Sequence, residues 1–141
     1  MIAQLVLLSA MFSSQSVAAD PSGFVLWPKG APPGDPNSKV SYANHTLSVS
    51  HREKDGLVEI HEKFADVIVV QTGRAVLVVG GEVIEAASTE SGEIRGKSIR
   101  GGVERMVSAG DVIRIAAGMP HQFLIAAGKQ ITYVLVKIAV P

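Results

Sequence analysis

Four side chains with acid–base and metal-binding chemistry lie in two separate stretches of the chain. Glu59 and His61 stand two residues apart, and Asp66 follows shortly after them. His121 lies much further along, directly after a glycine- and proline-containing turn. Imidazole nitrogens and carboxylate oxygens are ligands that Mn(II), Fe(II), Zn(II) and Ni(II) accept in proteins. These residue types therefore indicate a divalent metal site, provided that the fold brings the two stretches together.

The composition narrows the chemistry and the partners. Cysteine is absent from the 141 residues, which excludes thiolate ligands, a thiol nucleophile and disulfide bonds. Thirteen basic residues balance thirteen acidic ones, so no excess of charge favours nucleic acid or an anionic membrane as a partner. The chain also lacks the G-x-S-x-G elbow of serine hydrolases. Any metal must therefore be held by imidazole and oxygen.

The elements that must position these side chains are predicted to be β-strands. From Thr46 onward, short runs rich in Val and Ile alternate with Gly or Asp-Gly turns. Glu59 and His61 share one face of such a strand, because alternate residues point to the same side. Many short strands are typical of a sandwich or barrel. The predicted strands are 45–53, 57–63, 66–71, 74–80, 82–87, 103–108, 111–116, 121–126 and 130–139.

The dipeptide Asp55-Gly56 predicts a tight hairpin next to the candidate site. In that hairpin Arg52 lies opposite Glu59, and His51 falls on the other face. A slip of one residue in the register would bring His51 to the site instead, which makes it a reserve ligand.

Three further features concern the surroundings of the site. Lys63 lies on the face of Glu59 and His61, where it would pair with a carboxylate or attract an anionic substrate. Thr72-Gly73 predicts a chain reversal between two strands. The polar, glycine-containing segment 88–102 is predicted to be a long loop, either a solvated surface loop or a lid over the barrel.

The N-terminal region differs in composition from the rest. An apolar run followed by small residues predicts a secretory signal peptide over 1–19, the alternative being a buried strand or helix. Residues 20–44 hold five of the seven prolines and predict a proline-rich arm over the barrel, or else a flexible linker. The remaining residues, 45–141, form the predicted barrel domain. We therefore expect a periplasmic or secreted protein with no membrane attachment after cleavage.

The first of the two stretches resembles the first motif of the cupin superfamily. That motif has two histidines two residues apart, then an acidic residue, then a glycine. Glu59 and His61 stand at the places of the two histidines, Asp66 at that of the acidic residue, and Gly73 at that of the glycine. Glu59 is a departure, because a carboxylate replaces an imidazole.

The second stretch resembles the second cupin motif. Gly110, Gly118 and His121 match its spacing, whereas Ala116 stands where proline is usual. The resemblance covers about residues 45–140 and is greatest to small exported bacterial single-domain cupins of unassigned activity.

The resemblance implies an all-β, single-domain cupin-type barrel (a double-stranded β-helix, or jelly roll) with an N-terminal arm. It also implies that His61, Asp66, His121 and Glu59 converge on one divalent metal ion, Mn, Fe, Zn or Ni. Glu59 is either the fourth ligand or a catalytic general base. The protein would bind or transform a small molecule there. If Glu59 and His61 face inward, Val58 and Ile60 form an outward apolar stripe, which the arm or the second subunit of a homodimer is expected to cover. The alternatives are a metal-free ligand-binding module and a structural or interaction protein.

Overall fold

The computed structural model describes residues 23–32, 34 and 39–141. The signal peptide predicted over 1–19 lies outside the described residues and stays a prediction. The arm, 20–44, is described only in part. Among the described residues, the structure contains no helix with the length and apolar character needed to cross a membrane.

Strands make up most of the described chain, so the all-β prediction is confirmed. They are joined mainly by short turns, and a single turn of 3₁₀-helix precedes them. The elements in chain order are η1 (Pro28–Gly30), β1 (Lys39–Ser41), β2 (His45–Arg52), β3 (Val58–His61), β4 (Phe64–Val79), β5 (Glu82–Ile84), β6 (Ala87–Glu90), β7 (Glu93–Gly96), β8 (Ser98–Arg100), β9 (Val103–Ser108), β10 (Val112–Ile115), β11 (His121–Leu124) and β12 (Ile131–Ala139).

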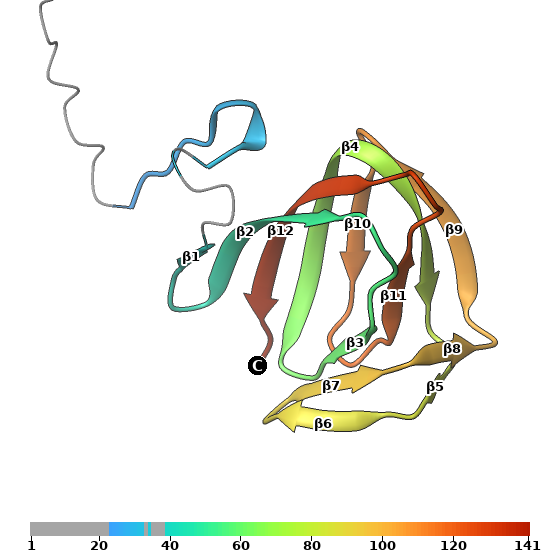
Figure 1. The fold of residues 1–141 in the computed structure, drawn as a ribbon. Helices are drawn as coiled ribbons and strands as arrows, with labels where there is room; N and C mark the ends of the chain where they lie inside the picture. Colours follow the sequence, from blue (N-terminus) through green and yellow to red (C-terminus); the bar gives the residue numbers. More distant parts are fainter. Residues whose placement is uncertain (1–22, 33, 35–38) are drawn as a thin grey trace, which may run out of the picture.

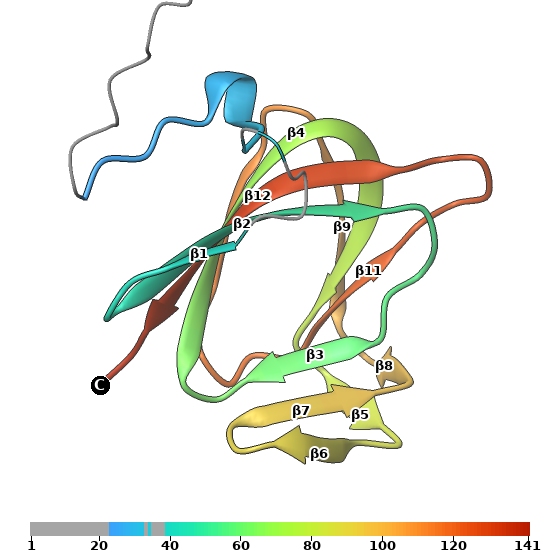
Figure 2. The same cartoon turned by 60° about the vertical axis from the view of Figure 1, so that its left-hand side comes forward.

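The strands form an antiparallel sheet that curls around a central core. Its order is β1-β2-β12-β4-β11-β3-β7-β6, and β9 and β10 also pair with β4. Strands β5 and β8 form a separate two-stranded ribbon. Figures 1 and 2 show β2 and β12 on one side of the barrel and β3 and β11 on the other, with β4 running from the first side to the second. The site lies between these two sides.

Strand β4 joins the two sides, because its first half pairs with β10 and β12 and its second half with β9 and β11. The predicted reversal at Thr72-Gly73 is therefore wrong, and the two predicted strands 66–71 and 74–80 are one strand. The chain bends at Gly73, whose φ is 75°. A Cβ atom there would collide with the carbonyl oxygen of Gln130, so this close approach requires glycine.

The predicted tight hairpin at Asp55-Gly56 is also wrong. Strands β2 and β3 do not pair, and the intervening residues carry the chain from one side of the barrel to the other. The Asp55 carboxylate accepts a hydrogen bond from the Ile125 amide at 2.6 Å, and the Gly56 amide donates to the Phe123 carbonyl at 2.9 Å. These two hydrogen bonds attach the segment between β2 and β3 to β11 and to the residue that follows it.

The segment 88–102 is not a long loop, which corrects the sequence prediction. It contributes to β6 and contains β7 and β8, and β7 pairs with the site strand β3. The β5–β8 ribbon covers the outer face of β3, since Val83 and Val58 both approach the backbone of Gly96. Val58 is consequently fully buried. The β5–β8 ribbon, rather than the arm or a second subunit, covers that part of the predicted apolar stripe.

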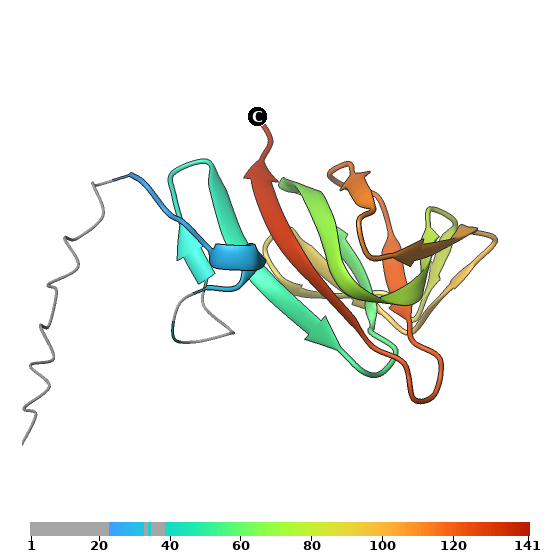
Figure 3. The same cartoon turned by 90° about the horizontal axis from the view of Figure 1, so that it is seen from above.

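The described part of the arm lies on the outer surface of the barrel, as Figure 3 shows from above. The Gln71 side-chain amide of β4 donates a hydrogen bond to the Lys29 carbonyl at 3.1 Å. Gly30 packs within contact distance of Val134 in β12. These contacts lie on the side of the sheet away from the candidate site.

The apolar core fills the barrel interior beside the candidate site. Phe123 and Tyr133 stack within it, with ring centroids 5.1 Å apart. Burial of such side chains is the main favourable contribution to folding. The buried cluster consists of Ile68, Val70, Ala75, Leu77, Val107, Ile115, Phe123, Ile125, Ile131 and Tyr133.

Candidate metal centre

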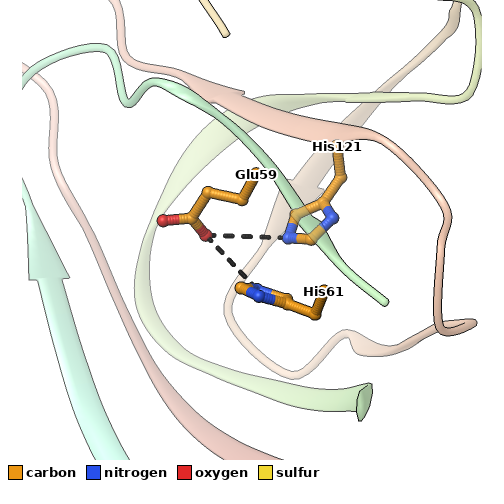
Figure 4. A group of neighbouring side chains, drawn as sticks. All are labelled: Glu59, His61 and His121. Atoms are coloured by element: carbon orange, nitrogen blue, oxygen red, sulfur yellow. Dashed lines mark ion pairs between the residues drawn. The ribbon is translucent and has the colours of Figure 1, made fainter. Parts of the chain in front are cut away.

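Strand pairing brings the four predicted ligands together. Glu59 in β3 lies directly opposite His121 in β11, and His61 follows on the same face of β3. Asp66, near the start of β4, lies opposite Lys137 in β12. Figure 4 shows the side chains of Glu59, His61 and His121 pointing toward one another. Residues far apart in the sequence therefore meet inside the barrel because antiparallel register sets them side by side.

Donor atoms of Glu59, His61 and His121 lie within 4.8 Å of one another, and Asp66 approaches both imidazoles. The Glu59 Oε2 atom lies 3.9 Å from His61 Nε2 and 3.7 Å from His121 Nε2. The Asp66 Oδ2 atom lies 3.4 Å and 3.7 Å from the same two nitrogens. Atoms bound to one ion at about 2.1 Å lie roughly 3 Å apart at right angles and roughly 3.4 Å apart in a tetrahedron. A slight contraction of the observed spacing would meet these values.

The second nitrogen of each imidazole is held by the surrounding protein. His61 Nδ1 lies 2.5 Å from Glu93 Oε2, and His121 Nδ1 lies 3.2 Å from the Met119 carbonyl oxygen. When Nδ1–H donates to these acceptors, the lone pair of each Nε2 points to the common centre. A carboxylate or carbonyl in this position is the usual partner of a metal-binding histidine.

The environment of Asp66 provides the best test of whether a cation fits this site. Its side chain is 3% exposed, and among the described residues its Oδ1 atom has no hydrogen-bond partner. Burial raises the pKa of Asp66, although Lys137 and the two imidazoles act in the opposite direction. An unsatisfied buried carboxylate oxygen is costly. A cation held by both Asp66 oxygens would remove that cost, so the donor set fits a metal ion.

Glu59 is ionised over nearly the whole pH range. Burial alone would raise its pKa, but the neighbouring His121 and the charges of Arg52 and Arg95 outweigh burial and lower the pKa to about 2. The Arg52 guanidinium donates to Glu59 Oε1 at 3.3 Å, which leaves Oε2 facing the imidazoles. The predicted proximity of Arg52 to Glu59 is correct, although the predicted hairpin is not its cause.

Lys137 brings a cation into the cluster. Its Nζ atom lies 2.9 Å from His61 Nδ1, 3.0 Å from His61 Nε2 and 3.9 Å from Glu93 Oε1. Burial lowers the pKa of Lys137, and the carboxylates of Asp66 and Glu93 oppose this effect. The site thus contains a positive charge of its own next to the candidate ligands.

The structure places two neighbouring residues, His51 and Lys63, outside the cluster. His51 lies away from the site, as expected without a register slip: its half-exposed ring bonds to Thr132 at 2.7 Å and Glu53 at 3.1 Å, so its role as reserve ligand falls away. Lys63 does not share the face of the ligands, so that prediction is wrong. It is exposed and donates to Ser91 at 2.8 Å. It follows the end of β3, where strict alternation of side chains no longer holds.

Three residues of the site were missed by reasoning from the sequence: Glu93, Arg95 and Lys137. Glu93 lies opposite His61 and Arg95 opposite Glu59 in the β3–β7 pair. The signal for β7 was the alternation of charged and apolar or small residues over 93–96, which is a strand pattern inside a polar segment. The signal for Lys137 was one charge within an apolar strand, on the face of Tyr133.

Comparisons with known proteins identify the fold. A conserved protein with a double-stranded β-helix domain from Klebsiella pneumoniae subsp. pneumoniae has a TM-score of 0.53 and 17% identity, covering 73% of this chain and 75% of its own. The DMSP lyase DddQ from Ruegeria pomeroyi DSS-3 has a TM-score of 0.50 and 11% identity over 70% of this chain. A cupin 2 conserved barrel domain protein from Salinispora arenicola CNS-205 has a TM-score of 0.49 and 19% identity, covering 73% and 74%.

The curled antiparallel sheet and the similarity to a double-stranded β-helix define this chain as having the cupin fold. The resemblance predicted from the two motifs is confirmed at the level of the fold. The chain spans only 40% of the length of the lyase. No protein-family model matches the chain, and no curated protein matches its sequence.

The raised pKa of Asp66 predicts a specific effect on stability. Because its folded-state pKa lies above the ordinary value of 3.8, the ionised carboxylate destabilises the metal-free protein above that folded-state pKa. Below pH 3.8 the group is protonated in both states and the cost disappears. Asp66→Asn should therefore raise the unfolding free energy of EDTA-treated protein at pH 7 by about 1 kcal/mol, measured by urea denaturation.

The exposed Glu104→Gln substitution is the matched control for loss of a negative charge, and it should change the unfolding free energy by less than about 0.5 kcal/mol. A destabilised Asp66→Asn protein at pH 7 would contradict the prediction.

Proposed function

We propose that Glu59, His61, Asp66 and His121 hold one divalent metal ion and that the protein binds or transforms a small molecule beside it. The main support is the pair of imidazoles, each with Nδ1 held by an acceptor and Nε2 directed at the two carboxylates. A bound divalent ion would polarise an oxygen of the ligand or lower the pKa of a bound water. The chain's own groups orient the ligands and limit the space around them.

The donor set supports a hard divalent metal. Two carboxylates and two imidazoles offer an equal number of oxygen and nitrogen donors, and cysteine is absent. Oxygen-rich sets suit Mn(II) and Fe(II), whereas Zn(II) and Ni(II) also accept imidazole and carboxylate. The carboxylate of Glu59 in place of an imidazole shifts the preference toward the first two metals.

Of the two roles left open for Glu59, the geometry supports that of ligand. Its Oε2 atom faces both imidazoles, and a pKa of about 2 makes it a weak base near neutral pH. A general base is most effective when its pKa lies near the working pH. Our proposal therefore assigns Glu59 to metal binding rather than to proton abstraction.

The alternative, a metal-free binding module, also has one specific observation in its favour. The carboxylates of Glu59, Asp66 and Glu93 are balanced by the cationic groups of Arg52, Arg95 and Lys137 within the same cluster. Buried acids compensated in this way do not require a metal ion for their charge. Direct measurement of bound metal separates the two functions.

Metal binding should depend on the two imidazoles. Wild-type protein is expected to bind one equivalent of Mn²⁺ in calorimetric titration and to retain metal in elemental analysis after gentle purification. His61→Ala and His121→Ala each remove one donor and should weaken Mn²⁺ binding about 100-fold or more. His51→Ala is the control, because that ring lies outside the cluster. Equal binding by wild type and both site variants would refute the proposal.

Glu93 should affect metal affinity without touching the metal. Glu93→Gln replaces the carboxylate that orients His61 and is expected to lower Mn²⁺ affinity about 10- to 100-fold, as for other partners of ligating histidines. Calorimetric titration measures this loss. Glu90→Gln, in the neighbouring strand β6 and exposed, should leave the affinity at the wild-type value. An unchanged affinity for Glu93→Gln would mean that the hydrogen bond to His61 has no role in binding.

We also propose a homodimer formed through the surface of β9 and β10. Val103 and Val112 are 53% and 71% exposed there and line a cavity of about 530 Å³, whose other walls are mainly apolar side chains of β4, β9 and β10. Apolar surface of this kind commonly marks an interface. Light scattering after size-exclusion chromatography should give the mass of a dimer, and Val112→Glu that of a monomer. A monomeric wild type would contradict the proposal.

A further inference from the structure

We propose that the metal-loaded pocket binds a small carboxylic acid as its anion, and that the Lys137 ammonium pairs with the carboxylate. This inference rests on the proposed metal centre and names the class of ligand that the centre would take.

The charge balance of the pocket requires an anion once a metal is bound. The acidic and basic side chains around the site are partly to fully buried, with exposures between 3% and 29%. Their charges cancel when the histidines are neutral, so a divalent ion adds two uncompensated positive charges. Uncompensated charge in a poorly solvated pocket is unfavourable. A bound carboxylate offsets one of these two charges, whereas a neutral or cationic ligand offsets neither.

Of the three basic side chains in the cluster, Lys137 is the one with N–H groups still able to donate to a ligand. Arg52 already donates to Tyr133 at 2.9 Å and to Glu59, and Arg95 donates to Glu93 and the Ile94 carbonyl, both at 3.0 Å. In contrast, the contacts of Lys137 shorter than 3.9 Å in the described cluster are with the two ring nitrogens of His61.

Metal binding would remove those acceptors from Lys137. His61 Nδ1–H is directed at Glu93, and its Nε2 lone pair would be donated to the metal. Neither nitrogen could then accept a hydrogen bond from the ammonium. The metal and Lys137 also repel each other. The flexible side chain must therefore move away from the metal and find another acceptor within the pocket, and a ligand carboxylate supplies one.

The cavity favours a short carbon skeleton over an inorganic anion. Its volume is about 150 Å³, room for roughly five water molecules. Ile68, Phe123 and Leu135 contribute apolar side chains to its lining, and the charged groups of the site contribute most of the remainder. An acid of a few carbon atoms can place its carboxylate near Lys137 and its carbons against these side chains. Phosphate would make no such apolar contacts.

The test compares lactate with lactamide, its neutral analogue, on Mn²⁺-loaded protein with no excess free metal. Binding is followed by calorimetry and by the relaxation of water protons at bound Mn²⁺. We expect lactate to bind at least tenfold more tightly than lactamide. Lys137→Met should lose at least tenfold in lactate affinity and nothing in lactamide affinity, while binding Mn²⁺ as tightly as wild type or more tightly. Lys137→Arg should retain the preference for lactate.

Lys137→Met should weaken lactate binding but not Mn²⁺ binding. This difference distinguishes carboxylate binding by Lys137 from a structural role, because a damaged site would lose affinity for both Mn²⁺ and lactate. Lys63→Met, at an exposed position, is the control for loss of a lysine charge. Equal affinities for lactate and lactamide, equal lactate affinity of Lys137→Met and wild type, or phosphate binding as tight as that of lactate would overturn the inference alone. A wild type that binds no Mn²⁺ would overturn the proposed function and this inference together.

Discussion

The antiparallel pairing of β3 with β11 and with β7 is the constraint on which the candidate site depends. It sets Glu59 opposite His121 and Arg95, and His61 opposite Glu93. Side chains alternate between the two faces of a strand, so a shift of one residue would turn the ligands out of the barrel and Val58 and Ile60 into it. The β5–β8 ribbon covers the outer face of β3 and buries Val58, and this burial opposes such a shift.

A dense set of compensated charges is the second property of the barrel interior. Each acid that faces the imidazoles has a basic neighbour: Arg52 for Glu59, Lys137 for Asp66 in the strand register, and Arg95 for Glu93. Such compensation makes it possible to bury carboxylates beside an apolar core. Only Asp66 retains a buried oxygen without a hydrogen-bond partner among the described residues, which singles it out as the place where a cation would be most favourable.

The strands of the fold were largely predictable because period-two alternation and turn residues are local signals. The failures at Asp55-Gly56 and Thr72-Gly73 share one physical cause. Turn-forming residues also serve where a chain crosses between sheets or bends within a strand, and only the partner strands distinguish these cases. The segment 88–102 was misassigned because its short strands are polar and gain stability from pairing with β3 rather than from their own composition.

The amino-acid sequence by itself determined the strand pattern, the absence of thiol chemistry and the four candidate ligands Glu59, His61, Asp66 and His121. Local geometry and intrinsic chemistry suffice for the first two conclusions, whereas the ligand set also rests on the resemblance to the two cupin motifs. Only the tertiary structure decided that Glu93 holds His61, that Lys137 enters the same cluster and that His51 and Lys63 lie outside it. These contacts join strands that are distant in the chain, and their register follows from the packing of the whole barrel rather than from any one segment.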